Sequence, residues 1–266
     1  MQSKILFLGT AGDPVVIGKQ QRSSGGIIFQ YEDSQFHIDP GPGALLMAKM
    51  TGVNLRENTG ILATSNALQT ANDMNAVISA MTLDGLDKKG VLVCPSSVVQ
   101  LGSFLLPGYQ DMLEKVIIID NTRKIGINNI DIEIIELGED IGSNCGFKFI
   151  TPRFNLTYIP NTKLSEKMAE GLQDTDILMI SVKNPRGVES SGSLNSEDAD
   201  RLIRMANPQI AIITGFGVKM LQADPLYEIR DMQKNAGIQV IAAKDGMTVN
   251  PSSFASTIRQ KNLKSF

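Results

Sequence analysis

The chain has 266 residues, of which 42% are hydrophobic and 20% charged, and this composition excludes wholesale disorder. Its 25 basic and 28 acidic side chains give a formal net charge of -3. It therefore lacks the basic surplus that neutralises phosphates, and nucleic acid is not a favoured partner. No apolar run approaches the ~18 residues that a membrane helix needs, and the first residues carry no signal-peptide pattern. We therefore expect a cytoplasmic protein that contacts no membrane.

The scarcity of histidine and cysteine restricts the possible metal chemistry. The chain has one histidine, His37, so a site built from several imidazoles cannot exist. The two cysteines, Cys94 and Cys145, fit neither a disulfide framework nor the spacing of a zinc module. We expect both to be buried, reduced thiols.

The first part of the chain is rich in short β-segments. Apolar and β-branched residues predict strands at 4–10, 25–31, 35–39, 61–65 and 91–94, with a polar loop at 11–24. A run of helix formers predicts a helix at 44–50. Met74, Val77, Ile78 and Met81 recur at helical spacing, and Asp73 precedes them as the expected cap of that helix.

The second part changes from strands to an alternation of helices and strands. Strands are predicted at 116–120, 130–137, 145–150 and 156–159. Helices at 164–173, 196–205 and 225–235 then alternate with strands at 176–182, 210–214 and 238–242. Ser193 and Asn195 are the expected N-terminal cap of the middle helix, and Glu197 and Asp198 place acid in its first turn. Two β-rich halves, each closed by helices, predict two sheets stacked between helical layers. We expect one domain over 1–250 and a polar tail over 251–266.

Several short motifs occur in an order that identifies a fold. These are Phe7-Leu8-Gly9-Thr10, Ser24-Gly25-Gly26, His37-Ile38-Asp39-Pro40-Gly41, Ala63-Thr64-Ser65, Asn72-Asp73-Met74-Asn75-Ala76, Tyr158-Ile159-Pro160-Asn161-Thr162 and Ile213-Thr214-Gly215-Phe216-Gly217-Val218-Lys219-Met220. Together they resemble the metallo-β-lactamase fold, in the branch of ribonuclease Z-like and related metal-dependent hydrolases. The resemblance runs from about residue 5 to 249. It implies an α/β fold, a four-layer αββα sandwich with the site at one edge of the stacked sheets.

The resemblance also locates the positions where that family holds its metal ions. Its H-x-H-x-D-H loop aligns with residues 65–70, and the later ligand positions align further along the chain. The aligned positions hold Ser65, Ala67, Gln69, Thr70, Glu139, Asn161 and Gly215. A zinc-type hydrolase needs three or more nitrogen, thiolate or carboxylate donors to hold the ion and acidify its water. Because the single carboxylate Glu139 cannot supply the three or more ligands that the ion needs, we expect no catalytic metal, no cofactor and no catalytic residues.

Three further residues are candidate remnants of the cleft. Asp39 resembles the acid that orients a metal-ligating histidine in the family, and without that histidine we expect it to cap the 40–44 turn. His37 lies two positions earlier, on the same strand face by the period-two rule, and is expected to be a satisfied strand residue. Lys219, like Lys244, ends a loop on the site side, but sequence spacing alone provides no contact with a serine such as Ser65.

The 11–24 loop carries Lys19 and Arg22 near the expected site. It is either a solvated loop or a contact for an anion or a partner.

The combined expectation is a pseudoenzyme that acts as a structural or regulatory subunit, with a protein partner or as a homo- or hetero-oligomer. Inactive members paired with an active relative occur in the family that the chain resembles. Two alternatives remain open. One is an enzyme, hydrolytic or otherwise, with a rebuilt site of Glu139, Asn161, Gln69, Thr70 and a lysine. A related form of it is an oxygen-donor site for Mg²⁺ or Ca²⁺ made of Glu139, Asn161, Gln69 and Asp39. The other is a small-molecule binder that uses the vacated metal cleft.

Overall fold

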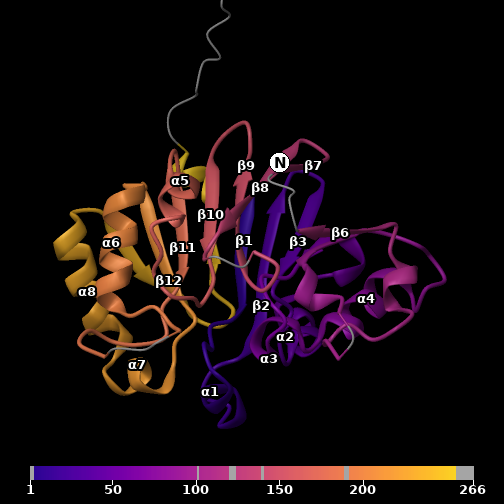
Figure 1. Ribbon diagram of the computed structural model, residues 1–266, viewed down its shortest axis with the longest axis horizontal. Coiled ribbons are helices and arrows are strands. Elements are labelled where there is room, and N and C mark those ends of the chain that lie inside the picture. The colour runs from indigo at the N-terminus through magenta and orange to yellow at the C-terminus, as the bar shows by residue number, and fades with distance from the viewer. Residues whose placement is uncertain (1–2, 101, 120–123, 139–140, 189–191, 256–266) are drawn as a thin grey trace, which may run out of the picture.

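The computed structural model of the chain describes residues 3–100, 102–119, 124–138, 141–188 and 192–255 (Figure 1). These residues form two seven-stranded sheets. The first has the order β14-β1-β2-β3-β4-β5-β6, with strands at Thr248–Val249, Lys4–Gly9, Ser24–Tyr31, Ser34–Ile38, Asn58–Leu62, Val91–Pro95 and Lys115–Ile119. The second has the order β13-β12-β11-β10-β9-β8-β7, with strands at Gln239–Ala242, Ile210–Thr214, Ile177–Ser181, Asn155–Ile159, Cys145–Ile150, Ile130–Glu136 and Lys124–Ile127.

Helices cover the outer face of each sheet, as Figure 1 shows. The first sheet is covered by α2 (Ala44–Thr51) and α4 (Met74–Thr82), and the second by α5 (Met168–Leu172), α6 (Ser196–Ala206) and α8 (Pro225–Ala236). The predicted four-layer αββα sandwich is therefore confirmed. Among the described residues, no helix combines the length and hydropathy needed to cross a membrane.

Three apolar layers hold the sandwich together. The central layer lies between the sheets and is rich in aromatic rings, with the centroids of Phe29 and Phe149 5.0 Å apart. The two outer layers join each sheet to its helices. Both cysteines are buried and free, as predicted.

Short helices connect the strands at one edge of the sandwich. They are α1 (Pro14–Gly18), α3 (Leu68–Ala71) and α7 (Val218–Gln222), and the 3-10 turns are Leu55–Glu57, Ser96–Val98, Tyr109–Met112 and Pro251–Phe254. None of these short helices and 3-10 turns was predicted from the sequence, and neither were strands β7 and β14. The sequence does contain a signal for α1, because an aspartate followed by a proline is typical of the start of a helix. In the structure Asp13 caps α1 by accepting a hydrogen bond from the Val16 amide, and Pro14 occupies the first turn.

Other boundaries differ from the predictions for local reasons. Strand β4 begins at Asn58 and ends at Leu62, three residues earlier than predicted at both ends. Its polar start is stable because Gln35 Nε2 donates to Asn58 Oδ1 at 2.6 Å. Helix α5 begins at Met168 rather than at 164. Within the predicted tail, Pro251 is buried, whereas residues 256–266, like residue 120 of a predicted strand, lie outside the described residues.

Asp73 caps a different helix from the one expected. It precedes α4, but its side chain makes no capping bond to that helix. Its Oδ2 instead accepts bonds from the amides of Gly43 and Ala44, at 2.9 and 3.0 Å. These amides open α2, whose N-cap residue Gly43 has no side chain to accept them, so Asp73 joins the two helices.

Candidate functional site

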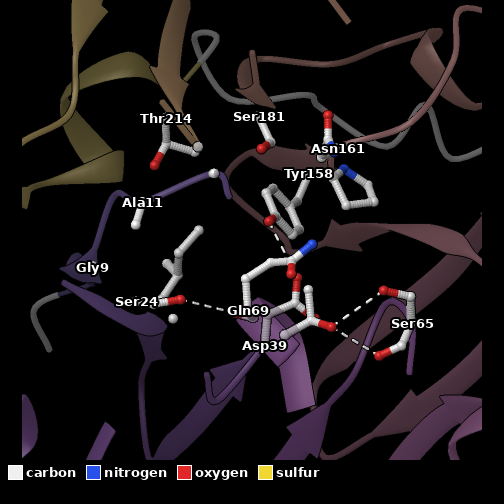
Figure 2. Close-up of a pocket in the computed structure, with 16 residues that line it drawn as sticks. Gly9, Ala11, Ser24, Asp39, Ser65, Gln69, Tyr158, Asn161, Ser181 and Thr214 are labelled. Atoms are coloured by element: carbon white, nitrogen blue, oxygen red, sulfur yellow. Dashed lines mark hydrogen bonds between the residues drawn. The ribbon is translucent and has the colours of Figure 1, made fainter. Parts of the chain in front are cut away.

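A small pocket lies at the edge of the sandwich where strands of both sheets end (Figure 2). Its cavity volume is about 50 Å³, which is room for about four water molecules. The lining residues are Gly9, Ala11, Gly12, Ser24, Gly26, Ile27, Asp39, Ser65, Gln69, Thr70, Tyr158, Pro160, Asn161, Ser181, Thr214 and Gly215. In Figure 2, Ser181 and Thr214 of the second sheet, with Asn161 just after its strand β10, face residues that follow strands of the first sheet across this space: Asp39, Ser65 and Gln69.

Asp39 is the carboxylate of the pocket, and its two oxygens are occupied by protein donors. Oδ1 accepts from the Thr64 amide at 2.7 Å, and Oδ2 accepts from Thr64 Oγ1 at 2.9 Å and from the Tyr158 hydroxyl at 3.2 Å. Burial raises the Asp39 pKa to about 7, although these bonds pull it down. The expected capping of the 40–44 turn is wrong. The carboxylate joins the two sheets instead, because Thr64 follows β4 and Tyr158 belongs to β10.

The loop that aligns with the family's metal motif is held together by its own hydroxyls. Thr70 Oγ1 donates to the carbonyls of Ser65 and Ala67, at 2.9 and 3.1 Å, and lies 3.2 Å from Ser65 Oγ. Ser24 Oγ adds a bond to the Gln69 carbonyl at 3.1 Å. No described lysine lines the pocket, so the described residues there form no serine–lysine pair with Ser65.

Gly215 stands where a side chain cannot fit. Its φ is +66°, and a Cβ built on it would lie 1.7 Å from Ser181 Oγ and 2.7 Å from Ser181 Cβ. A Cβ on Gly12 would likewise lie 1.8 Å from the Gly215 carbonyl oxygen. The two glycines let the loops after β1 and β12 approach each other, which narrows the cleft.

Two hydroxyl-bearing residues that line the pocket have no side-chain partner among the described residues. Ser181 and Thr214, the last residues of β11 and β12, are 5% and 4% exposed. Among the described residues neither hydroxyl makes a hydrogen bond. The buried Oδ1 of Asn161 also lacks a partner there, while its Nδ2 donates to Ser193 Oγ at 3.3 Å. The pocket therefore offers unused, uncharged donors and acceptors.

The structure brings together five of the seven aligned positions: Ser65, Gln69, Thr70, Asn161 and Gly215, with Asp39 beside them. Ala67 is close in sequence but does not line the pocket; it is the N-cap residue of α3. Glu139 lies outside the described residues, so its predicted place is untested. Lys219 and Lys244 are exposed and point to no pocket residue.

His37 does not belong to the cleft, contrary to the expectation that it shares a face with Asp39. Its strand neighbours Ile28 and Ile61 belong to the outer apolar layer under the helices. The alternation breaks at Asp39, whose φ of +53° turns its side chain to the pocket. His37 is fully buried, with Nε2 2.8 Å from the Gly25 carbonyl, and burial lowers its pKa to about 4. It is therefore a neutral side chain that donates one bond.

These residues do not fit the two-metal centre that the fold implies. Among the described residues, no three of the His, Cys, Asp and Glu side chains converge on one point. The pocket's carboxylate is fully bonded to Thr64 and Tyr158, and the Gly215 position has no room for a ligand side chain. Hydroxyls and amides are weak donors for a zinc-type ion.

Sequence reasoning missed Ser181, Thr214 and Tyr158. A signal existed for the first two, since each is the polar residue that ends an otherwise apolar parallel strand. The carboxyl ends of parallel strands meet at one edge of a sheet, where sites form. Tyr158 looked like a strand residue, and only the sheet packing brings its hydroxyl to Asp39.

The chain has a relative in sequence, although that relative is an uncharacterized protein. No protein-family model matches the chain. The uncharacterized protein MJ1374 of Methanocaldococcus jannaschii is 25% identical over 257 residues, covering 94% of this chain and 95% of that protein.

Solved structures with the same architecture are more distant in sequence. The metallo-β-lactamase fold protein YhfI of Bacillus subtilis has a TM-score of 0.77 at 13% identity and covers 94% of this chain and 99% of its own. A diphosphatase of the PhnP family has a TM-score of 0.70 at 13% identity, and the match covers 94% of this chain and 98% of the diphosphatase. Human tRNase Z, short form, has a TM-score of 0.68 at 11% identity, and the match covers 93% of this chain and 98% of the tRNase Z chain. The chain therefore has the metallo-β-lactamase fold.

Proposed function

We propose that this protein is a catalytically inactive form of the metallo-β-lactamase fold, without the di-metal centre, and that it acts as a structural or regulatory binding subunit. The solved structures that it resembles include a diphosphatase and a tRNase Z. Their chemistry does not transfer to a cleft with another donor set.

The observation that carries the proposal is the contact between Ser181 and Gly215. A histidine or aspartate at 215 would collide with Ser181 Oγ, so the cleft is packed for the absence of a ligand side chain. The bonds from Thr64 and Tyr158 to Asp39 support the same conclusion, because they satisfy a carboxylate without any cation.

Elemental analysis tests the proposal. The protein is purified without chelators, incubated with zinc and manganese, and passed through a desalting column. We expect less than about a tenth of an equivalent of bound metal, and no change in melting temperature with EDTA. One or two equivalents of zinc, iron or manganese, lost in the Asn161→Ala or Glu139→Gln variant, would contradict the proposal and favour the rebuilt hydrolase site.

A second candidate function, small-molecule binding, is favoured by one specific observation. The unpartnered Asn161 Oδ1 is a buried polar group, which as a rule has a partner, and the unpartnered hydroxyls of Ser181 and Thr214 line the same pocket. The pocket has no basic side chain, so its ligand would be a small uncharged molecule with hydroxyl or amide groups. Crystals of the wild type and of the Ser181→Ala/Thr214→Val variant distinguish the outcomes. A non-water molecule bound in the wild type alone supports this function, and water alone in both opposes it.

A further inference from the structure

A second, open groove lies beside the closed cleft. It runs between α1, the segment after β11 and α7, and has a volume of about 500 Å³. Its apolar surface comes from Val15, Val188 and Val218, and Lys183 and Lys219 lie along it. Val15 is 51% exposed, which is high for an apolar side chain of a folded protein. Figure 1 places α1 and α7 at the same end of the molecule.

The two lysines of this groove carry uncompensated charge. Among the described residues neither Lys183 nor Lys219 forms an ion pair or a side-chain hydrogen bond. The whole chain has a net charge of -3, so acidic side chains outnumber basic ones over the chain although these two lysines are unpaired. Among the described residues that line the groove, the one acid already accepts two backbone hydrogen bonds.

That acid is Asp13, which also lines the groove. Its Oδ1 accepts from the Val16 amide at 2.9 Å and its Oδ2 from the Val218 amide at 3.2 Å. These amides open α1 and α7, and their N–H groups stabilise the negative charge. Asp13 therefore fixes the two walls of the groove to each other rather than pairing with a lysine.

Two more cations extend the basic character along the same loop. Lys19 follows Val15 by one helical turn, and the guanidinium of Arg22 stacks on the Phe216 ring at 5.6 Å from its centroid. Phe216 lies between Gly215 and α7 in the chain. The described ion pairs of the chain do not include Lys19 or Arg22.

We propose that this basic groove docks an acidic segment of a partner protein. Its carboxylates pair with Lys183 and Lys219, and its apolar side chains cover Val15, Val188 and Val218. The combination of valines with lysines matches a peptide that carries both kinds of side chain, whereas a phosphate backbone would leave the valines uncovered. The inference rests on the proposed binding function and names the chemistry of its partner.

Fluorescence anisotropy with labelled synthetic peptides tests the inference. One short peptide alternates glutamate with leucine, and its matched control has glutamine at each glutamate position. We expect the acidic peptide to bind with an affinity that falls with salt, and to bind about tenfold more weakly to Lys183→Ala/Lys219→Ala. Lys115→Ala/Lys234→Ala removes two exposed lysines from other surfaces and is expected to leave the affinity unchanged.

The inference would be overturned by equal affinity for the acidic and glutamine peptides, by equal loss in both lysine variants, or by tighter binding of a labelled single-stranded oligonucleotide that depends on Lys183 and Lys219. Self-association of the protein that these two substitutions abolish, measured by light scattering, would overturn it in favour of a second copy. These results are independent of metal content. Stoichiometric zinc with intact peptide binding would refute the inactive cleft alone, and a metal-free protein without peptide binding would refute the groove alone.

Discussion

The hydroxyl of Ser181 fills the space above Gly215, where any other residue would place its Cβ. Each of the two positions restricts the other, because Gly215 also holds a φ of +66° that side chains rarely adopt. The packing of these two residues therefore leaves no room for a side chain at 215. A function that needed a side chain at 215 would first have to remove the one at 181.

The first prediction compares two glycines that share the left-handed conformation. Gly246 has a φ of +79° and open space around its missing Cβ, whereas Gly215 has the contact with Ser181. We expect Gly246→Ala to lower the free energy of unfolding by about 1 kcal/mol from backbone strain alone. Gly215→Ala should cost at least about 2 kcal/mol more, because a backbone-anchored clash must be relieved.

Urea unfolding measures both glycine variants, and the double variant Ser181→Gly/Gly215→Ala completes the cycle. A favourable coupling free energy between positions 181 and 215 is expected. If Gly215→Ala and Gly246→Ala lose the same stability, the packing argument fails.

The second prediction concerns the pH dependence contributed by Asp39. Its pKa is raised from 3.8 to about 7 in the folded protein by burial. Between these values the folded state binds the proton and the unfolded state releases it, so stability from this group is complete below pH 3.8 and is lost as pH rises towards 7. The slope is at most about 1.4 kcal/mol per pH unit. The stability of the wild type relative to Asp39→Asn should therefore fall between pH 5 and 7, and a constant difference would oppose it.

The third prediction has the opposite sign and concerns His37. Burial lowers its pKa from 6.5 to about 4, so the unfolded state binds the proton that the folded state excludes. Stability is complete above pH 6.5 and is lost as pH falls towards 4. Relative to His37→Gln, the wild type should lose stability between pH 6.5 and 5, measured by urea unfolding. Because Asp39 and His37 act in opposite directions over this range, each single variant should show the dependence that the other residue masks.

The fourth prediction tests the helix that Asp73 caps. Asp73→Ala should cost about 1 kcal/mol, as is usual for a lost cap. Hydrogen exchange locates the effect: the amides of Gly43 and Ala44 should exchange faster, because they donate to the missing carboxylate. The Val77 amide of α4 donates to the Asp73 backbone carbonyl and should keep its protection. Faster exchange at Val77 alone would restore the simpler assignment made from sequence.

The sequence was sufficient to predict the layers of the fold because the spacing of its hydrophobic residues distinguishes strands from helices. Segments such as Ile210–Thr214 are continuous apolar runs, which is typical of strands buried on both faces. Of the two residues expected to cap the middle helix, Ser193 and Asn195, the N-cap is Asn195, which forms a reciprocal pair with Asp198. Local signals of this kind depend only on residues near each other in the chain.

The site was less predictable because its contacts are between distant segments. Asp39 could be recognised as special, but its partner Tyr158 is 119 residues away. The closure of the cleft depends on the meeting of Ser181 with Gly215, and no spacing rule indicates it. His37 was assigned to the face of Asp39 because the period-two rule assumes a regular strand, and the positive φ of Asp39 breaks that regularity.

The fifth prediction contrasts a half-buried ion pair with an exposed one. Arg186 Nη2 lies 2.5 Å from Oδ2 of Asp200, whose side chain is 4% exposed, and Asn235 Nδ2 donates to the same oxygen at 3.0 Å. The other oxygen, Oδ1, has no partner among the described residues. Removing Arg186 leaves a buried carboxylate with one neutral donor, so Arg186→Ala should cost about 2–4 kcal/mol.

The matched control for this pair is Lys124, which lies 3.0 Å from Asp131 with both side chains about half exposed. Lys124→Ala should cost less than about 1 kcal/mol because water screens the pair. Adding Asp200→Asn to Arg186→Ala should restore part of the stability, since a neutral amide has a smaller desolvation cost than a carboxylate. Urea unfolding of the three variants separates burial from charge pairing. Equal costs for Arg186→Ala and Lys124→Ala would show that the burial of Asp200 does not set the strength of the pair.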